Sequence, residues 1–203
     1  MIWMDFTMHA SRKPDMCIYP RILFTVLLFT SSVPVSGNEY PVGIWIQNVH
    51  STMTDQTISL NADILYQLSD ESRKALEHGV PLVFDIEIRI KEVRNWMWDK
   101  LVAKKMLRYR VEHQPLTGQY LVSDNYRGRH QQFTSLPGAL EFIGKLENFP
   151  LMDTVSLSRE HKYVAQIKSV LDVQSLPAPL RPLAYLSTDW RLSSSWHNLE
   201  IGI

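Results

Sequence analysis

The chain has 203 residues with 21 basic and 21 acidic side chains, so its formal net charge is zero. This balance gives no electrostatic support for nucleic-acid binding, because that function requires a clustered positive surface. The only cysteine, Cys17, excludes an intramolecular disulfide and a thiolate cluster for a metal.

The first 37 residues have the organisation of a secretory signal peptide. Three basic residues precede an apolar run at 22–29, and Val35 and Gly37 suit the positions next to a cleavage site. We predict that residues 1–37 are removed, with Met16 as an alternative start of the chain. The mature protein is then a periplasmic domain.

An uncleaved N-terminal anchor is the alternative, which would hold the protein in the inner membrane with its domain facing the periplasm. The uncharged stretch runs only from 22 to 38 and contains Pro34, whereas a membrane-spanning helix needs about 20 apolar residues. With either N-terminus, residues 38–203 are expected to form one β-rich domain that lacks cysteine.

Val42, Ile44 and Ile46 recur at every second position, and apolar and polar residues alternate at 58–66, which predicts two strands that each bury one face. The polar stretch 50–56 is the expected turn between them. A short helix should follow over 69–79, because Ser69 is a favoured N-cap and Gly79 a favoured terminator.

The stretch from Val80 to His113 predicts a long hairpin at the centre of the fold. Residues 82–90 and 101–111 both alternate in period two, with charged side chains on the wet face. A turn centred on Met97 and Trp98 predicts three cross-strand pairs: Asp85 with Arg110, Glu87 with Arg108, and Ile86 with Tyr109. A shift by two residues would keep the same faces.

Turns with Gly118 and Gly128 separate further short strands near 120–122 and 131–133. Ser135 should cap a second short helix that carries an apolar stripe to Leu146. Strands are expected again at 151–157 and 163–173. The fold class is therefore mainly β (α+β), an antiparallel β-sandwich or curved sheet with a long central hairpin and two short helices.

The C-terminal segment differs from the rest because Pro177, Pro179 and Pro182 disfavour strand pairing. It also carries Tyr185, Trp190 and Trp196, which is too much apolar surface to leave in solvent. We expect an extended, partly polyproline segment that wraps back over the domain.

The chain resembles the proteobacterial DUF4390 family of uncharacterised exported proteins. The likeness is carried by LSDESRKALEHGVPLVFDIEI from Leu68, the Trp98-Asp99 pair, GQYLVSD from Gly118, FTSLPGALEFIGKLENFPL from Phe133, and LDVQSLPAPLRPLAYLSTDWRLSSSW from Leu171. The resemblance implies an exported protein of Gram-negative bacteria, and no activity, cofactor or active-site residue.

No constellation typical of catalysis is found in the sequence. There is no HExxH arrangement, no GxSxG or SxxK motif in the mature chain, and no glycine-rich phosphate loop. Asp124 with His130 and Asp189 with His197 are pairs of a kind that arises by chance. We therefore expect no catalytic residue, no metal site and no cofactor.

The tip of the central hairpin is the first candidate binding site. Arg94 and Lys100 flank Trp96 and Trp98, and tryptophans among cations suit an anionic membrane surface or an acidic partner. The structural alternative is that the two tryptophans point to opposite faces of a strand, so that one caps the core.

The C-terminal motif is the second candidate, in which Arg181, Trp190 and Arg191 would form a recognition groove. The structural alternative is that Trp190 fastens the segment to the domain while the arginines donate hydrogen bonds to backbone carbonyls.

These patterns favour a non-enzymatic binding or scaffolding domain of the cell envelope whose partner is an envelope protein or an anionic membrane surface. The alternative function is a hydrolase or transferase acting on envelope glycans or lipids. Its acid–base residue would be Asp99, Asp124, Asp189 or a histidine, placed in a concave pocket.

Overall fold

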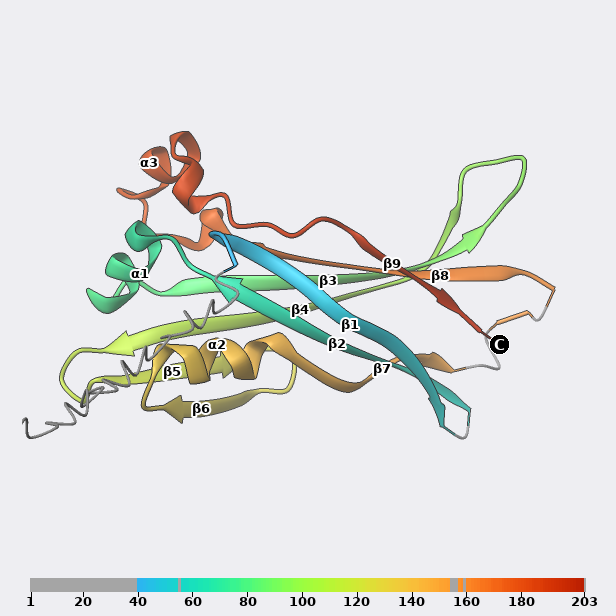
Figure 1. The fold of residues 1–203 in the computed structure, drawn as a ribbon, viewed down its shortest axis with the longest axis horizontal. Coiled ribbons are helices and arrows are strands. Elements are labelled where there is room, and N and C mark those ends of the chain that lie inside the picture. The colour runs from blue at the N-terminus through green and yellow to red at the C-terminus, as the bar shows by residue number, and fades with distance from the viewer. Residues whose placement is uncertain (1–39, 55, 154–156, 159, 203) are drawn as a thin grey trace, which may run out of the picture. The chain divides into compact units, whose positions relative to one another are not determined.

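Alternating apolar side chains build two antiparallel sheets that share one core (Figure 1). The computed structural model describes residues 40–54, 56–153, 157–158 and 160–202. The predicted signal peptide, its alternative as an anchor, and Met16 lie outside these residues. Residues Asn38–Ile203 belong to one compact unit.

The smaller sheet has the strand order β1-β2-β7. Its strands are β1 (Gly43–Thr54), β2 (Thr57–Gln67) and β7 (Lys145–Asp153). The larger sheet has the order β6-β5-β4-β3-β8-β9. Its strands are β3 (Leu82–Val93), β4 (Lys100–Gln114), β5 (Gln119–Asp124), β6 (Arg129–Phe133), β8 (Lys162–Leu171) and β9 (His197–Ile201).

Two short helices, α1 (Asp70–Glu77) and α2 (Leu136–Gly144), begin where the sequence predicts them. Each starts after a serine whose hydroxyl accepts a backbone hydrogen bond: Ser69 from the Ser72 N–H at 3.1 Å, and Ser135 from the Gly138 N–H at 3.3 Å. Such caps satisfy amide groups that a helix end leaves without a partner. The predicted mainly β class with short helices is confirmed.

The inner faces of both sheets meet in the core. Leu60 and Phe149 from the smaller sheet and Phe84 and Leu107 from the larger one are fully buried. Burial of each such side chain contributes about 1.5–3 kcal/mol, so the two sheets stabilise each other. The β3–β4 hairpin lies in the middle of the larger sheet, between β5 and β8.

The register predicted for this hairpin is wrong by two residues. Asp85 lies opposite Arg108, and Glu87 lies opposite Met106. Within the hairpin itself, the pairing shifts by one residue between Ile90 and Lys91, where Val102 is the extra residue of a bulge in β4. Bulges bend and twist a strand, and beyond this one the end of the hairpin turns away from the sheet (Figure 1).

The C-terminal segment packs on the domain, but the prediction of an extended, partly polyproline wrap is wrong in part. The segment contains two short 3-10 turns (Val173–Ser175 and Thr188–Trp190), the helix α3 (Arg181–Leu186) and the edge strand β9. Pro182 is compatible with α3 because it lies in the first turn, where a missing N–H costs nothing.

Candidate functional site

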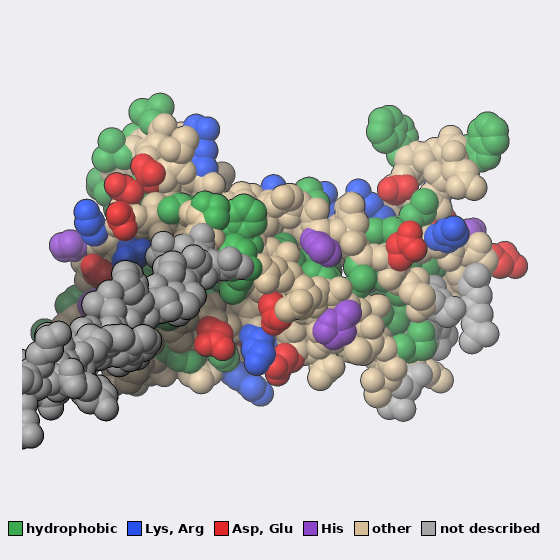
Figure 2. Space-filling view, in the orientation of Figure 1, with side chains coloured by type: hydrophobic (Ala, Val, Ile, Leu, Met, Phe, Trp, Pro, Cys, Tyr) green, Lys and Arg blue, Asp and Glu red, His purple; other side chains and the backbone are tan. Residues whose placement is uncertain are grey.

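The tip of the β3–β4 hairpin is formed by residues 94–99, between the ends of the two strands. Trp96 is 96% exposed, Met97 70% and Trp98 95%. The interpretation that one of the tryptophans caps the core is therefore wrong. Two groups of hydrophobic side chains stand out from this end of the domain in the space-filling view (Figure 2).

Most cations that the sequence places near the tip already have partners. Arg94 donates to Glu92 (3.1 Å), Lys104 lies 2.7 Å from Glu87, and the Lys105 ammonium donates to the carbonyl of Pro150 (2.6 Å). The hydrogen bond from Arg94 lowers the pKa of Glu92. Among the described residues, Lys91 and Lys100 form no ion pair within 4 Å, but Lys100 lies opposite Glu92 and its charge helps to lower the pKa of that carboxylate.

Glu87 fixes the charged face behind the tip. It accepts a hydrogen bond from Arg89 (2.7 Å) in addition to its contact with Lys104. Burial raises the pKa of Glu87, but the two cations together outweigh burial and the pKa is lowered. A carboxylate with a lowered folded-state pKa contributes stability above its ordinary pKa, and this stability is lost as the pH falls through the lowered value.

Replacing Glu87 by glutamine should therefore lower the free energy of unfolding by about 1 kcal/mol at neutral pH. The difference from wild type should shrink as the pH falls below about 4, where the wild-type carboxylate also becomes neutral. Urea unfolding at a series of pH values measures both effects. Glu147→Gln is the control, because the Glu147 side chain is 68% exposed and its one ion pair among the described residues is with Lys145, at 3.4 Å. If the difference in unfolding free energy between Glu87→Gln and wild type did not change with pH, the charged interactions of Glu87 would not be its cause.

The C-terminal motif does not bring Arg181, Trp190 and Arg191 together in a groove. Arg181 donates to the carbonyl of Leu176 (2.8 Å), and Arg191 donates to the carbonyl of Tyr185 (2.8 Å). Trp190 is 7% exposed and belongs to the core. These contacts fasten the segment, as the structural alternative from the sequence describes.

A partly buried ion-pair network holds the start of this motif. Arg108 donates to both oxygens of Asp85 (2.7 and 2.6 Å) and to Asp172 (3.1 Å). Asp172 also accepts from the backbone of Gln174 (3.0 Å) and from the hydroxyl of Ser175 (2.6 Å). This network joins β3, β4 and the first turn of the C-terminal segment.

The three carboxylates considered for acid–base chemistry lie in separate places. Asp99 is in the hairpin tip, and Asp189 is in the 3-10 turn that precedes β9. Asp124 accepts backbone hydrogen bonds from Tyr126 (2.9 Å) and Arg127 (3.0 Å), so it shapes the β5–β6 turn. His130 pairs with the hydroxyl of Ser123 (2.8 Å) instead. Across the described residues, no group of three His, Cys, Asp or Glu side chains could hold a metal ion.

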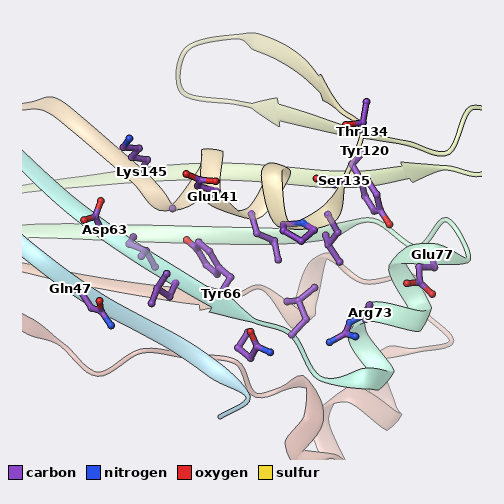
Figure 3. A pocket seen from close by; sticks show the side chains of 18 of the residues that line it. Gln47, Asp63, Tyr66, Arg73, Glu77, Tyr120, Thr134, Ser135, Glu141 and Lys145 are labelled. Atoms are coloured by element: carbon purple, nitrogen blue, oxygen red, sulfur yellow. The ribbon is translucent and has the colours of Figure 1, made fainter. Parts of the chain in front are cut away.

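A groove of about 1060 Å³ lies between β2 and α2, and the sequence gives no sign of it (Figure 3). β7 pairs with β2 only as far as Asp63, and from Ile64 onward the backbone edge of β2 forms one wall. Arg73 and Glu77 of α1, Tyr120 of β5 and Glu141 of α2 contribute side chains from other elements. The groove opens where β7 stops pairing with β2, and such long-range pairing cannot be read from local sequence.

The groove is lined by charged side chains of both signs. Among the described residues, no hydrogen bond joins its charged side chains to one another, and Asp63 accepts from Asn48 (2.8 Å). The hydroxyls of Tyr66 and Ser169 are hydrogen-bonded (3.0 Å), and burial raises the pKa of Tyr66, which keeps it neutral.

No helix in the described part of the chain is long and apolar enough to cross a membrane. The family model for DUF4390, a domain of unknown function, matches residues 43–200. No curated protein and no solved structure matches the chain. The match covers both sheets, the hairpin tip and the fastened C-terminal motif.

Proposed function

Because the chain belongs to the DUF4390 family, whose function is unknown, we propose a function from the geometry of the domain: it is a non-enzymatic envelope domain that docks on an anionic lipid bilayer through the β3–β4 hairpin tip. The observation that supports this proposal is the nearly complete exposure of Trp96 and Trp98. The signal-peptide-like N-terminus adds support for a periplasmic location.

The size of the tip favours a bilayer over a protein partner. Two tryptophans offer roughly 300–500 Å² of surface, whereas a stable protein interface buries about 800 Å² on each partner. A bilayer needs no matching surface, and tryptophan is enriched at the boundary between headgroups and hydrocarbon. The projecting hairpin brings these rings to a bilayer before the body of the domain makes contact (Figure 1).

Charge adds a second, weaker attraction. Lys91 and Lys100 lie at the base of the tip, where Glu92 and Asp99 offset part of their charge, and each cation near an anionic surface contributes about 1 kcal/mol. Docking should therefore weaken as salt is added, because salt screens exposed charges. The part of the binding free energy that comes from insertion of the tryptophans should persist at high salt.

The test uses the domain that begins at Asn38, because the apolar stretch before it would bind lipid by itself. Every strand pair and core contact described above lies within this domain, and its cooperative unfolding is verified first. Co-sedimentation is measured with vesicles of phosphatidylglycerol and phosphatidylethanolamine. Vesicles of phosphatidylcholine alone serve as the uncharged comparison.

The double variant Trp96→Ala/Trp98→Ala should weaken binding to the anionic vesicles by about tenfold or more, which corresponds to about 1.4 kcal/mol. Its free energy of unfolding should stay within about 0.5 kcal/mol of wild type, because the rings have no partner in the core. Leu116→Ala is the matched control, since Leu116 is fully exposed at a different turn. Equal binding by the double variant and wild type, or no binding by wild type, would refute the proposed function.

A further inference from the structure

Helix α3 forms a second apolar projection, separate in sequence from the hairpin tip. Three of its six residues expose large apolar side chains: Leu183 is 65% exposed, Tyr185 51% and Leu186 83%. The helix is held firmly, because Ala184 between them is fully buried and Arg191 donates to the Tyr185 carbonyl. Exposed apolar side chains that are grouped on a fixed element indicate a surface that binds a partner.

Two arginines flank α3, and Asp189 lies in the 3-10 turn between the helix and the second of them. Arg181 begins the helix, and Arg191 follows the 3-10 turn that succeeds it. Both side chains donate to backbone carbonyls, and neither forms an ion pair with a carboxylate in the described part of the chain. Leucines beside arginines that lack a carboxylate are complementary to anionic lipid, as is the hairpin tip.

The two projections lie at opposite ends of β3. The C-terminal segment that carries α3 is tied to the start of β3, where the Asp172 N–H donates to the Val83 carbonyl (2.8 Å). The tip follows the last residue of β3, Val93. Twelve residues in a strand span roughly 40 Å, so no single compact ligand contacts both.

Both projections nevertheless extend from the same long side of the domain. In the ribbon view α3 and the end of the hairpin rise above the same edge, and β9 runs between them (Figure 1). The space-filling view shows Lys and Arg side chains along that edge (Figure 2). Next to β9, Trp196 lies beneath Arg89, at 4.4 Å from the ring centroid, and Lys168, at 5.8 Å. A flat, negatively charged surface would meet these two cations, of which Arg89 also pairs with Glu87 (2.7 Å).

We propose that α3 is a second lipid-binding contact, so that the domain lies on an anionic bilayer at two points with the β9 side facing the headgroups. This inference rests on the proposed docking of the hairpin tip and adds an orientation to it. Two contacts on one rigid body act together, because the first makes the second effectively intramolecular. Loss of either contact should therefore weaken binding strongly.

Position-specific labelling tests the orientation directly. The only cysteine of the chain, Cys17, lies before Asn38, so one introduced cysteine in the domain is a unique site. An environment-sensitive fluorophore is attached to Met97→Cys, Leu186→Cys or Leu116→Cys and mixed with the phosphatidylglycerol-containing vesicles. Labels at 97 and 186 should shift to the emission of an apolar environment, whereas the label at 116 should stay in water.

Binding of unlabelled variants gives the independent measurement. Leu183→Gln/Leu186→Gln should weaken vesicle binding by about tenfold with unchanged stability, because both side chains are exposed. If the label at 97 enters lipid while the label at 186 stays in water and this variant binds like wild type, the second contact is refuted and docking by the tip stands. If neither label enters lipid, the proposed function itself fails.

Discussion

Replacing Trp190 by alanine is expected to lower the free energy of unfolding by about 4 kcal/mol, the usual cost of removing a buried aromatic ring. Trp190 is 7% exposed and packs in the core shared by the two sheets. The turn that carries it is fixed on both sides, since the Ser69 hydroxyl donates to the Asp189 carbonyl (2.7 Å) and the Asp189 N–H donates to the Ser187 hydroxyl (3.2 Å). Urea unfolding of the domain measures the loss.

Trp96→Ala is the matched control for this variant, because it removes the same side chain from a 96% exposed position. Its free energy of unfolding should differ from wild type by less than about 0.5 kcal/mol. If Trp190→Ala kept wild-type stability but lost vesicle binding, Trp190 would belong to a recognition groove and the fastening role assigned to it would be wrong.

The strands were predictable from sequence because each one buries a single face. In β2, Ile58, Leu60 and Ala62 enter the core and residues 59 and 61 between them face outward, which is the period that the sequence displays. Register was less predictable. Period-two patterns look the same after a shift of two residues, and the choice depends on Arg108, which reaches Asp85 and Asp172 at once.

The local sequence pattern of the hairpin tip could not predict that the tip is exposed. Residues 94–99 have the aromatic content of a core strand, and whether they are covered depends on where the neighbouring strand stops. β8 pairs with β3 only as far as Val93, so nothing in the described domain covers Trp96 or Trp98. The groove beside β2 depends on similarly distant contacts. Helix α3 was missed for a local reason, because its prolines suggest an extended segment whereas Pro182 suits the first turn of a helix.

The tryptophans have two different roles in the proposed function: a buried one stabilises the fold, and two exposed ones bind the bilayer. Trp190 stabilises the fold, whereas Trp96 and Trp98 contribute nothing to the core and expose surface that water disfavours. The C-terminal motif thus holds α3 in place instead of binding a ligand through Trp190. The buried residues of the motif therefore contribute to the proposed docking only indirectly, because they hold α3 in position.

Replacing Gly144 by alanine is expected to lower the free energy of unfolding by about 3 kcal/mol, near the upper end of the usual cost of overpacking. Gly144 is the last residue of α2. A Cβ atom at this position would overlap the carbonyl oxygen of Ile64 in β2. Backbone cannot move aside as a flexible side chain can, so α2 and the start of β7 would have to shift away from the sheet and widen the groove between them.

Gly138→Ala in the same helix separates this overlap from helix propensity. There a Cβ would meet the Ser135 hydroxyl at 3.2 Å and the Phe133 ring at 3.7 Å, both side-chain atoms that can adjust. The gain of about 1 kcal/mol from alanine in a helix should offset that crowding and leave stability within about 1 kcal/mol of wild type. Equal unfolding midpoints for the two variants would show that α2 does not approach β2 as closely as the structure places it.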